Sequence, residues 1–491
     1  MSHPDTILPQ IYSHIDSNIE KHIERIKEIC RIPGIAANNP EGIQKTTELI
    51  QKWFEDLGCI ETEVVKIEGP PVVYGYYDSG SKNTLNVYMM YDVKQETGEN
   101  WTMIKDPFDP QLMTMSPFKQ VLVGRGTINS KGPMTAFLNS LFSIKEIGEE
   151  LPVNLKFIAE GEEELGSEHL MQFIKKYEHK LKSADACFSA SGLAASQNID
   201  GVPIVHLGRK GTIELELECS GEYWNRGPTK RGIHSSLYAI VESPIWRLIQ
   251  ALSTMVDKND PSKVIIKGFY DNVAPPTSRD LELIDELAKT FDENSIKKAN
   301  DVKHFVHDLH GKDLLIKAFY TTTLNVQGIY GGYTGPKGKT VLPHNVKVKL
   351  ESRLIPNQNR NETVTNIRTH LDKHGYQDIK IVDGRWTNSN DWSRTDPDSG
   401  LVKVVTESYE KWGFKPEIWP YSLGSAPFYI WTKYLKMPIL SAGLGYGGRA
   451  HAPDEYYVIE NDSKQSKVAG LADAEKFYAY MLYQMKNRTL R

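Results

Sequence analysis

The chain has 491 residues, of which 40% are hydrophobic and 25% charged, a composition typical of folded globular proteins that excludes intrinsic disorder. Its formal net charge of −5 gives no electrostatic reason to expect a nucleic-acid partner. The sequence has no apolar run near the roughly 18 residues that a membrane helix needs, and its polar first residues do not resemble a secretory signal. We therefore expect a cytoplasmic protein of more than one domain, with no membrane partner.

The first part of the chain alternates helical and strand-like patterns. Apolar residues recur at helical spacing over 15–29 and 43–57, strands are predicted over 85–92 and 153–160, and a helix is predicted from residue 132. An acidic turn and a further helix follow residue 160. Strands that alternate with helices predict an α/β sandwich with a largely buried sheet.

The pattern changes after residue 210. Thr212–Cys219 alternates strictly, which predicts a sheet with one face in water. A helical stretch over 233–256, alternation over 346–354, a helix over 364–371 and a strand over 378–382 follow. This middle part is typical of a small α+β domain with an open sheet.

The α/β pattern returns from about residue 396, with helices predicted over 401–413 and 463–483 and a strand over 437–443. We therefore expect a catalytic α/β domain over 1–210 and 391–491, interrupted by an inserted α+β domain over 211–390.

The four cysteines, Cys30, Cys59, Cys187 and Cys219, lie far apart and form no CxxC pair. Four cysteines in a chain of this length do not make a disulfide framework. We expect buried free thiols in a reducing cytoplasm.

Four polar stretches have the character of loops at strand ends: MMYDV at 89–93, GRGTINSKGP at 124–133, EGEEELGSE at 160–168 and RAHAPDE at 449–455. Each is weak alone. An EGEEE run is usually a solvated turn, a single His is usually structural, and GRG…KGP lacks the spacing of a phosphate loop. The acidic run, however, directly follows a buried strand, where carboxylates often bind metals or abstract protons.

Taken together and in this order, these stretches resemble the di-zinc metallopeptidase family of carnosinase, aminoacylase, succinyl-diaminopimelate desuccinylase and glutamate carboxypeptidase. GYTGPKGKTVLPHN, SRLIPNQN and SLGSAP support the resemblance, which covers nearly the whole chain and is closest to the carnosinase-like branch. It implies an α/β catalytic domain and an inserted lid domain that mediates dimerisation, and therefore a homodimer.

The resemblance also implies two zinc ions held by two His and three carboxylates, one of them bridging, and a Glu that deprotonates the attacking water. By motif position, Glu163 corresponds to this base, and Glu164 and His451 to two of the five ligands. The other three ligand positions hold Met90, Asn129 and Ala190.

Thioether sulfur is a poor zinc ligand among oxygen donors, Asn129 carries no charge, and Ala190 offers no donor atom. The formal charge of the ligand set falls from −3 to −1. We expect no metal, or one divalent ion (zinc or manganese) bound with reduced affinity by Asn129, Glu164 and His451. Asp92, which the resemblance places behind the first metal-binding His, then needs another partner, for which Lys131 is the candidate.

The residues that would bind substrate match the family better. His234 corresponds to a lid histidine that stabilises the oxyanion, and Arg353 to an arginine that binds a substrate carboxylate. Thr340 and the backbone of Gly424 and Ser425 correspond to further carboxylate contacts. The alternative for His234 is a structural histidine at the start of a helix, and the alternative for Arg353 is a surface ion pair.

Three functions are compatible with these residues. The first is a hydrolase of a small amide-type bond in a carboxylate-bearing substrate, with an incomplete metal site and Glu163 as general base. The second is a non-catalytic dimeric relative that binds a small carboxylate ligand or a partner. The third is an ordinary two-zinc dipeptidase.

Overall fold

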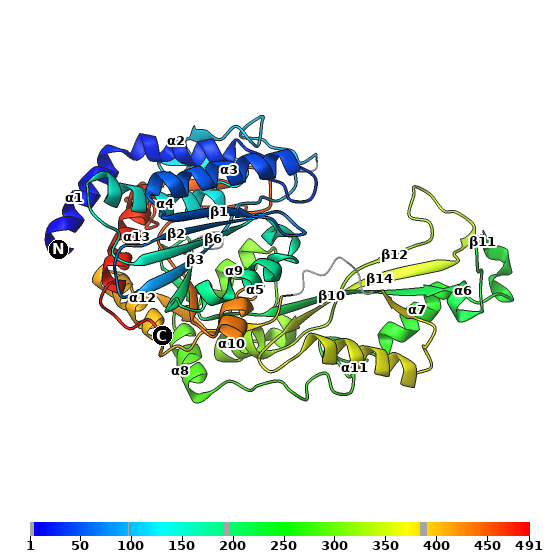
Figure 1. The fold of residues 1–491 in the computed structure, drawn as a ribbon. Helices are drawn as coiled ribbons and strands as arrows, with labels where there is room; N and C mark the ends of the chain where they lie inside the picture. The colour runs from blue at the N-terminus through cyan, green and yellow to red at the C-terminus, as the bar shows by residue number, and fades with distance from the viewer. Residues whose placement is uncertain (1–3, 97, 191–196, 383–389) are drawn as a thin grey trace. The chain divides into compact units, whose positions relative to one another are not determined.

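A computed structural model gives the fold of residues 4–96, 98–190, 197–382 and 390–491 (Figure 1). The chain divides into two compact units, unit 1 with Met1–Gly208, Arg394–Trp419 and Pro427–Arg491, and unit 2 with Arg209–Ser393 and Pro420–Ala426. The sequence places the boundaries after residues 210 and 390, whereas the units change after residues 208 and 393. The segment 420–426, which the sequence assigns to the catalytic domain, belongs to unit 2.

The described part of unit 1 contains a six-stranded mixed sheet. In spatial order its strands are β1 (Glu61–Val65), β2 (Val72–Tyr77), β6 (Asn154–Glu160), β3 (Thr84–Met90), β7 (Ala186–Ser189) and β18 (Ile439–Ser441). The strands from β6 to β18 run parallel. All residues of β6 are buried, so the predicted buried sheet is confirmed.

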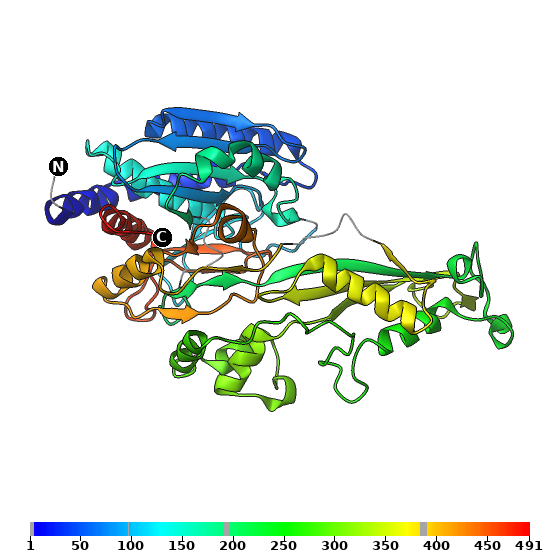
Figure 2. The ribbon, with the colours of Figure 1, turned by 60° about the horizontal axis from the view of Figure 1, so that its bottom comes forward.

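Helices cover both faces of this sheet (Figure 2). Phe54 of α3 stacks on Phe157 of β6, whereas Tyr177 of α5 packs on Tyr74 of β2, which points to the other face. The helices of unit 1 are α1 (Pro4–Ser17), α2 (Ile19–Cys30), α3 (Pro40–Leu57), α4 (Lys131–Glu146), α5 (Leu170–Leu181), α12 (Gly400–Lys411) and α13 (Leu471–Met485).

The ends of α3 illustrate how the sequence sets a helix. Asn39 accepts a 2.9 Å hydrogen bond from the N–H of Gly42, and Pro40 occupies the first turn, where its missing N–H costs nothing. Gly58 ends the helix with a φ of 93°, a left-handed conformation that suits glycine.

A smaller antiparallel sheet in unit 1 joins distant segments of the chain. Its strands are β19 (Gly447–Gly448), β20 (Tyr456–Glu460), β5 (Gln120–Val123) and β4 (Gln111–Met113). The pairing of β20 with β5 brings the RAHAPDE stretch beside the GRGTINSKGP stretch.

Unit 2 is built on an antiparallel sheet whose strands, in spatial order, are β12 (Asn325–Tyr330), β14 (Asn345–Leu354), β10 (Gly211–Ser220) and β15 (Lys380–Val382). Apolar side chains of β10 and β14 form one core with Leu248 of α7 (Pro244–Ser253) and Ile367 of α11 (Arg360–Lys373). The remaining helices of this unit are α6 (Gly221–Trp224), α8 (Ser278–Leu287), α9 (Glu293–Ala299) and α10 (Gly311–Tyr320).

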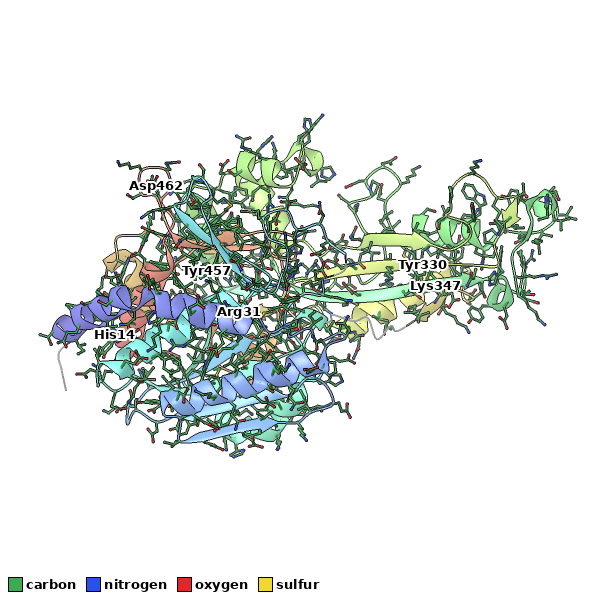
Figure 3. The ribbon with its side chains drawn as sticks, turned by 90° about the horizontal axis from the view of Figure 1, so that it is seen from above. His14, Arg31, Tyr330, Lys347, Tyr457 and Asp462 are labelled. Carbon is green, nitrogen blue, oxygen red and sulfur yellow. The ribbon has the colours of Figure 1, made fainter. Side chains whose placement is uncertain are left out.

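The prediction that β10 has one wet face is wrong for its central residue. Glu216 is only 4% exposed, since the ammonium of Lys347 lies 2.8 Å from its carboxylate and Tyr330 also donates to it. Tyr330 and Lys347 come from the neighbouring strands β12 and β14 (Figure 3). Their long side chains cover the strand that the alternation left open to water.

Two predicted helices are too long. Residues 233–256 contain the short strand β11 (Ile233–His234), which pairs with β13 (Val341–Leu342), and α7 begins only at Pro244. The last helix begins at Leu471 rather than near residue 463. Gly470 passes so close to the carbonyl oxygen of Ile459 that an added Cβ would lie 2.6 Å from it.

All four cysteines are free thiols, as predicted, although Cys59 is only partly buried. No helix among the described residues has the length and apolarity needed to cross a membrane.

Candidate active site

Three parallel strands of unit 1 end at the same edge of the sheet. Met90, the last residue of β3, stands opposite Glu160, the last residue of β6, and Ala190 directly follows β7 on the other side of β3. Ligands of open α/β sheets bind at the carboxyl ends of the strands. The topology therefore brings Met90, Ala190 and the acidic stretch after Glu160 to this edge.

Asp92 fixes the loop that carries the two glutamates. Its fully buried carboxylate accepts hydrogen bonds from the backbone N–H of Glu163 at 3.2 Å and of Glu164 at 3.0 Å. Burial, together with the charge of Glu164, raises the pKa of Asp92 to about 7. Lys131, the predicted partner, interacts with Asp92 electrostatically, while its ammonium donates to the carbonyls of Ile29 at 3.0 Å and Ile32 at 2.6 Å.

Asn129, just before α4, lies between the two surviving ligand candidates. Its Nδ2 donates to Glu164 Oε1 at 2.6 Å and lies 2.8 Å from His451 Nε2. The same His451 nitrogen is 3.2 Å from Glu164 Oε1. The carboxylate of Glu164 only accepts, which favours the NH2 group of the amide on its side, and the hydroxyl of Ser130 donates to Asn129 Oδ1 at 3.1 Å. Asn129, Glu164 and His451 thus contact one another directly, and we call them the amide triad.

A lysine stands beside the amide triad. Lys94 Nζ is 3.8 Å from Glu164 Oε2, and its side chain is 44% exposed whereas that of Glu164 is 5% exposed. The buried carboxylate therefore has a positive charge on the side that faces solvent, besides the amide donor of Asn129.

Glu455 holds the loop that presents Asn129. Its Oε1 accepts from the backbone N–H of Ile128 at 3.1 Å and of Asn129 at 2.9 Å, and its Oε2 lies 3.0 Å from the guanidinium of Arg125. Glu455 and Arg125 are both buried. Burial raises the pKa of Glu455, and the backbone donors and Arg125 oppose that rise.

The structure brings together the predicted residues of unit 1 at one edge of the sheet. Among the residues that the structure describes, there is no group of three or more His, Cys, Asp or Glu that could hold a metal ion.

The predicted substrate residues all belong to unit 2. His234 is exposed at the start of a short 3-10 helix, where its Nδ1 accepts from the backbone N–H of Ser236 at 3.2 Å. Arg353 on β14 donates to Thr212 Oγ1 at 3.0 Å and pairs with Glu351. These contacts leave the roles of His234 and Arg353 as predictions.

Thr340 and Gly424 are exposed, and the N–H of Gly424 donates to Ser422 Oγ at 3.2 Å. The hydroxyl oxygen of Ser425 is buried and finds no hydrogen-bond partner within the described parts of the chain. A buried hydroxyl without a partner is available for a ligand atom.

Three residues of the site are absent from the sequence-based prediction: Lys94, Ser130 and Glu455. Each lies within four residues of a predicted one, but only the folded contacts reveal what it does. For Glu455 the sequence held a signal, because it lies four residues after the candidate ligand His451 and carboxylates near a ligand often support the site.

The profile of the peptidase family M20/M25/M40 matches residues 91–470. Among curated relatives, the Cys-Gly metallodipeptidase DUG1 of Candida albicans is 27% identical over 367 residues, which are 71% of this chain and 72% of the relative. The Beta-Ala-His dipeptidase of Homo sapiens is 25% identical over 390 residues, 76% of this chain and 72% of the relative.

Solved structures give the same result. The M20 family metallo-carboxypeptidase Sso-CP2 of Sulfolobus solfataricus is 30% identical, with a TM-score of 0.79 over 94% of this chain and 99% of that one. The dipeptidase Dug1p of Saccharomyces cerevisiae is 22% identical, with a TM-score of 0.79 over 97% of this chain and 98% of that one. The predicted α/β fold with a second domain is confirmed.

Proposed function

The chain belongs to the peptidase family M20/M25/M40, whose named relatives hydrolyse C–N bonds, and from that premise we propose a hydrolase that works without a two-metal cluster. Its substrate is a short peptide or similar amide with a free carboxylate. The dipeptidase names of the relatives and the chain's Arg353 support this substrate class.

The amide triad is the observation that carries this proposal. In a paired zinc site a bridging carboxylate would stand where Asn129 donates to Glu164 at 2.6 Å. An N–H donor repels a cation, and Met90 and Ala190 supply neither charge nor an oxygen atom. The donor set therefore does not fit two zinc ions.

A single zinc or manganese ion is the most that Asn129, Glu164 and His451 would hold. To accept it, Asn129 must turn its carbonyl oxygen inward and give up the hydrogen bond that its NH2 group donates to Glu164. The proposed affinity is lower than that of a complete site for this reason, and the ion is not required for the contacts within the amide triad.

The remaining chemistry belongs to the chain's own side chains. Glu163 takes the proton of the attacking water, and Asp92 holds Glu163 in place through its backbone N–H. His234 donates to the oxyanion that develops on the scissile carbonyl. Arg353, Thr340, Gly424 and Ser425 bind the substrate carboxylate.

A homodimer formed through unit 2 is part of the proposal. Strand β12 lies at the edge of its sheet, so the backbone groups on its outer side pair with no strand among the described residues of unit 2. Its side chains Val326 and Ile329 are 45% and 51% exposed. A second copy of this edge would supply both the strand and the apolar cover. The four free thiols support a reducing, cytoplasmic location.

The second candidate is a non-catalytic member that binds a small carboxylate ligand. The same triad favours it, because Asn129 donates to Glu164 and contacts His451, and none of these contacts supplies an electrophile that would polarise an amide carbonyl. Both candidate functions include binding of a carboxylate-bearing molecule, but only the first includes its hydrolysis.

Turnover of Cys-Gly and β-Ala-His separates them, measured both with added zinc or manganese and with chelator, and compared in each case with Glu163→Gln. Hydrolysis by the native chain that Glu163→Gln abolishes, with one added metal ion per chain or with none, supports the hydrolase. Unchanged hydrolysis in Glu163→Gln eliminates the proposed base. Absence of hydrolysis, combined with dipeptide binding that Arg353→Gln weakens, establishes the non-catalytic role instead.

A further inference from the structure

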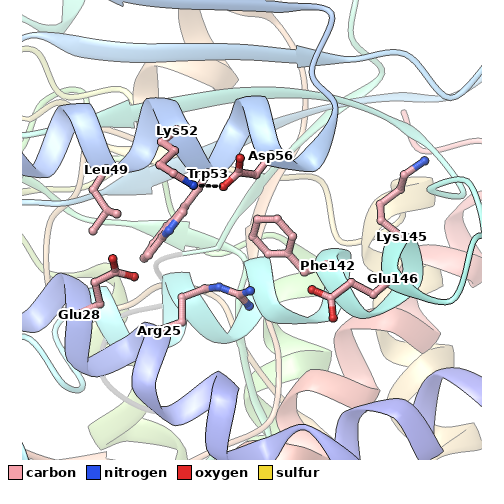
Figure 4. A pocket seen from close by; sticks show the side chains of 9 residues that line it. All are labelled: Arg25, Glu28, Leu49, Lys52, Trp53, Asp56, Phe142, Lys145 and Glu146. Carbon is pink, nitrogen blue, oxygen red and sulfur yellow. Dashed lines mark hydrogen bonds and ion pairs between the residues drawn. The ribbon is translucent and has the colours of Figure 1, made fainter.

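A cavity of about 540 Å³ in unit 1 lies between α2, α3 and α4, and none of the predicted active-site residues lines it (Figure 4). Leu49, Trp53 and Phe142 form an apolar wall, and Arg25 and Glu28 stand beside it. Ligand pockets typically combine such an apolar lining with a few polar groups, in volumes of about 300–1,000 Å³.

Among the described residues, Arg25 is the cation of this cavity that has no carboxylate within ion-pair distance, although the charges of Glu146 and Glu28 act on it from farther away. Its guanidinium lies 4.2 Å from the ring centroid of Phe142 and donates to the neutral side-chain amide of Asn139. Glu146, which faces it in Figure 4, acts on Arg25 electrostatically but forms its close ion pair with Lys21, at 2.8 Å. A half-buried guanidinium with unused donors is a strong site for a carboxylate.

Buried groups hold Arg25 in place from behind. Asn139, which accepts from Arg25, donates to Glu475 Oε1 at 2.7 Å, and Glu475 Oε2 lies 2.6 Å from His22 Nδ1. Asn139, Glu475 and His22 are all buried. The guanidinium is thus positioned before any ligand arrives, which lowers the entropy cost of binding.

Glu28 supplies the opposite charge one helical turn from Arg25 on α2. It is exposed, and its charge acts on Arg25 and Lys52 from a distance greater than that of an ion pair. The other cations of the lining have acceptors, since Lys52 pairs with Asp56, and Lys145 lies 2.8 Å from Glu150. The indole N–H of Trp53 also has no acceptor within the described residues.

We propose that this cavity binds a free amino acid with an aromatic or large aliphatic side chain. Its carboxylate pairs with Arg25, its ammonium with Glu28, and its side chain packs on Trp53 and Leu49. Nothing in this assignment depends on the proposed hydrolase, since binding is measured without turnover.

Isothermal titration calorimetry with L-phenylalanine tests the site, with N-acetyl-L-phenylalanine and L-phenylalaninamide as probes that each lack one charge. The native chain binds L-phenylalanine more tightly than either probe. Arg25→Gln and Glu28→Gln each weaken binding by about tenfold or more. The matched controls Glu24→Gln, on the same helix, and Arg31→Gln, at the C-cap of that helix, lie outside the lining and leave binding unchanged.

Two further variants make the result decisive. Arg25→Lys keeps the positive charge but loses the planar guanidinium, so it weakens binding less than Arg25→Gln does. If Arg25→Gln does not fold, Arg25→Lys takes its place. Arg353→Gln leaves binding unchanged if the cavity is the site. Binding that is lost in Arg353→Gln, equal binding of all three probes, or no binding of L-phenylalanine overturns the assignment.

Discussion

The side-chain amide of Asn129 donates a 2.6 Å hydrogen bond to Glu164, at the position where a bridging metal ligand is expected from the sequence. The proton of this amide occupies the side of Glu164 that would otherwise face a cation. The proposed loss of the paired metals therefore rests on a contact as well as on the missing ligands.

Asn129→Asp tests this contact. Without metal, two carboxylates face each other in a buried site, so the free energy of unfolding falls by roughly 1–3 kcal/mol in the presence of EDTA. Added zinc restores it, because the new carboxylate binds the cation. Thermal unfolding with EDTA and with zinc measures both effects. Equal stability of Asn129→Asp and the native chain in EDTA would contradict the role given to the amide.

Glu455→Ala is expected to destabilise the loop that presents Asn129. It removes the acceptor of two backbone N–H groups and a partner of buried Arg125, which costs roughly 3–5 kcal/mol of unfolding free energy. Urea titration measures the loss. Glu460→Gln, on the same segment but in an exposed pair with Lys119, is the control and costs less than about 1 kcal/mol. A similar cost for both variants would remove Glu455 from the account.

Lys210 gives unit 2 a pH dependence. Burial, and less strongly the charge of Arg353, lowers the pKa of Lys210 to about 8, against roughly 10.4 in an unfolded chain. Between these values the unfolded chain binds more protons than the folded one, so stability rises with pH.

The comparison of the native chain with Lys210→Met isolates this effect. The unfolding free energy of the native chain increases relative to the variant by about 3 kcal/mol from pH 8 to pH 10.5. Urea titrations at several pH values give the difference. A difference that stays flat or falls over this range would show that the Lys210 pKa is not lowered.

Ile329→Asp tests the dimer edge. The side chain is 51% exposed in a single chain, so the charge does little to the fold but is buried on association. Sedimentation measures the mass, which falls from dimer to monomer. Ile60→Asp, at a residue 69% exposed in unit 1, is the control and leaves the dimer intact. A monomeric native chain, or a dimeric Ile329→Asp variant, would dispose of this interface.

Motif order along the sequence was enough to predict the fold and to place Met90, Asn129, Glu164 and His451 in one region, since strand ends gather at one edge of a sheet. It could not predict that Asn129 would donate to Glu164 and contact His451, because the direction of an amide depends on which acceptors the fold places around it. Asp92 shows the same limit, as its partners are backbone N–H groups, which a sequence does not distinguish.

Helix ends were hard to predict for a related reason. The stretch over 233–256 has helical periodicity, yet Ile233 pairs with Leu342, more than a hundred residues away. The cavity at Arg25 could not be predicted from the sequence either, because its lining residues come from three separate helices.

The most direct test of the claim that the native chain holds no pair of metal ions is a calorimetric titration with zinc. The native chain is compared with a variant that combines Met90→His, Asn129→Asp and Ala190→Asp. The account predicts at most one weakly bound zinc per native chain and two tightly bound zinc ions per chain of the variant. Two tightly bound ions in the native chain would contradict it.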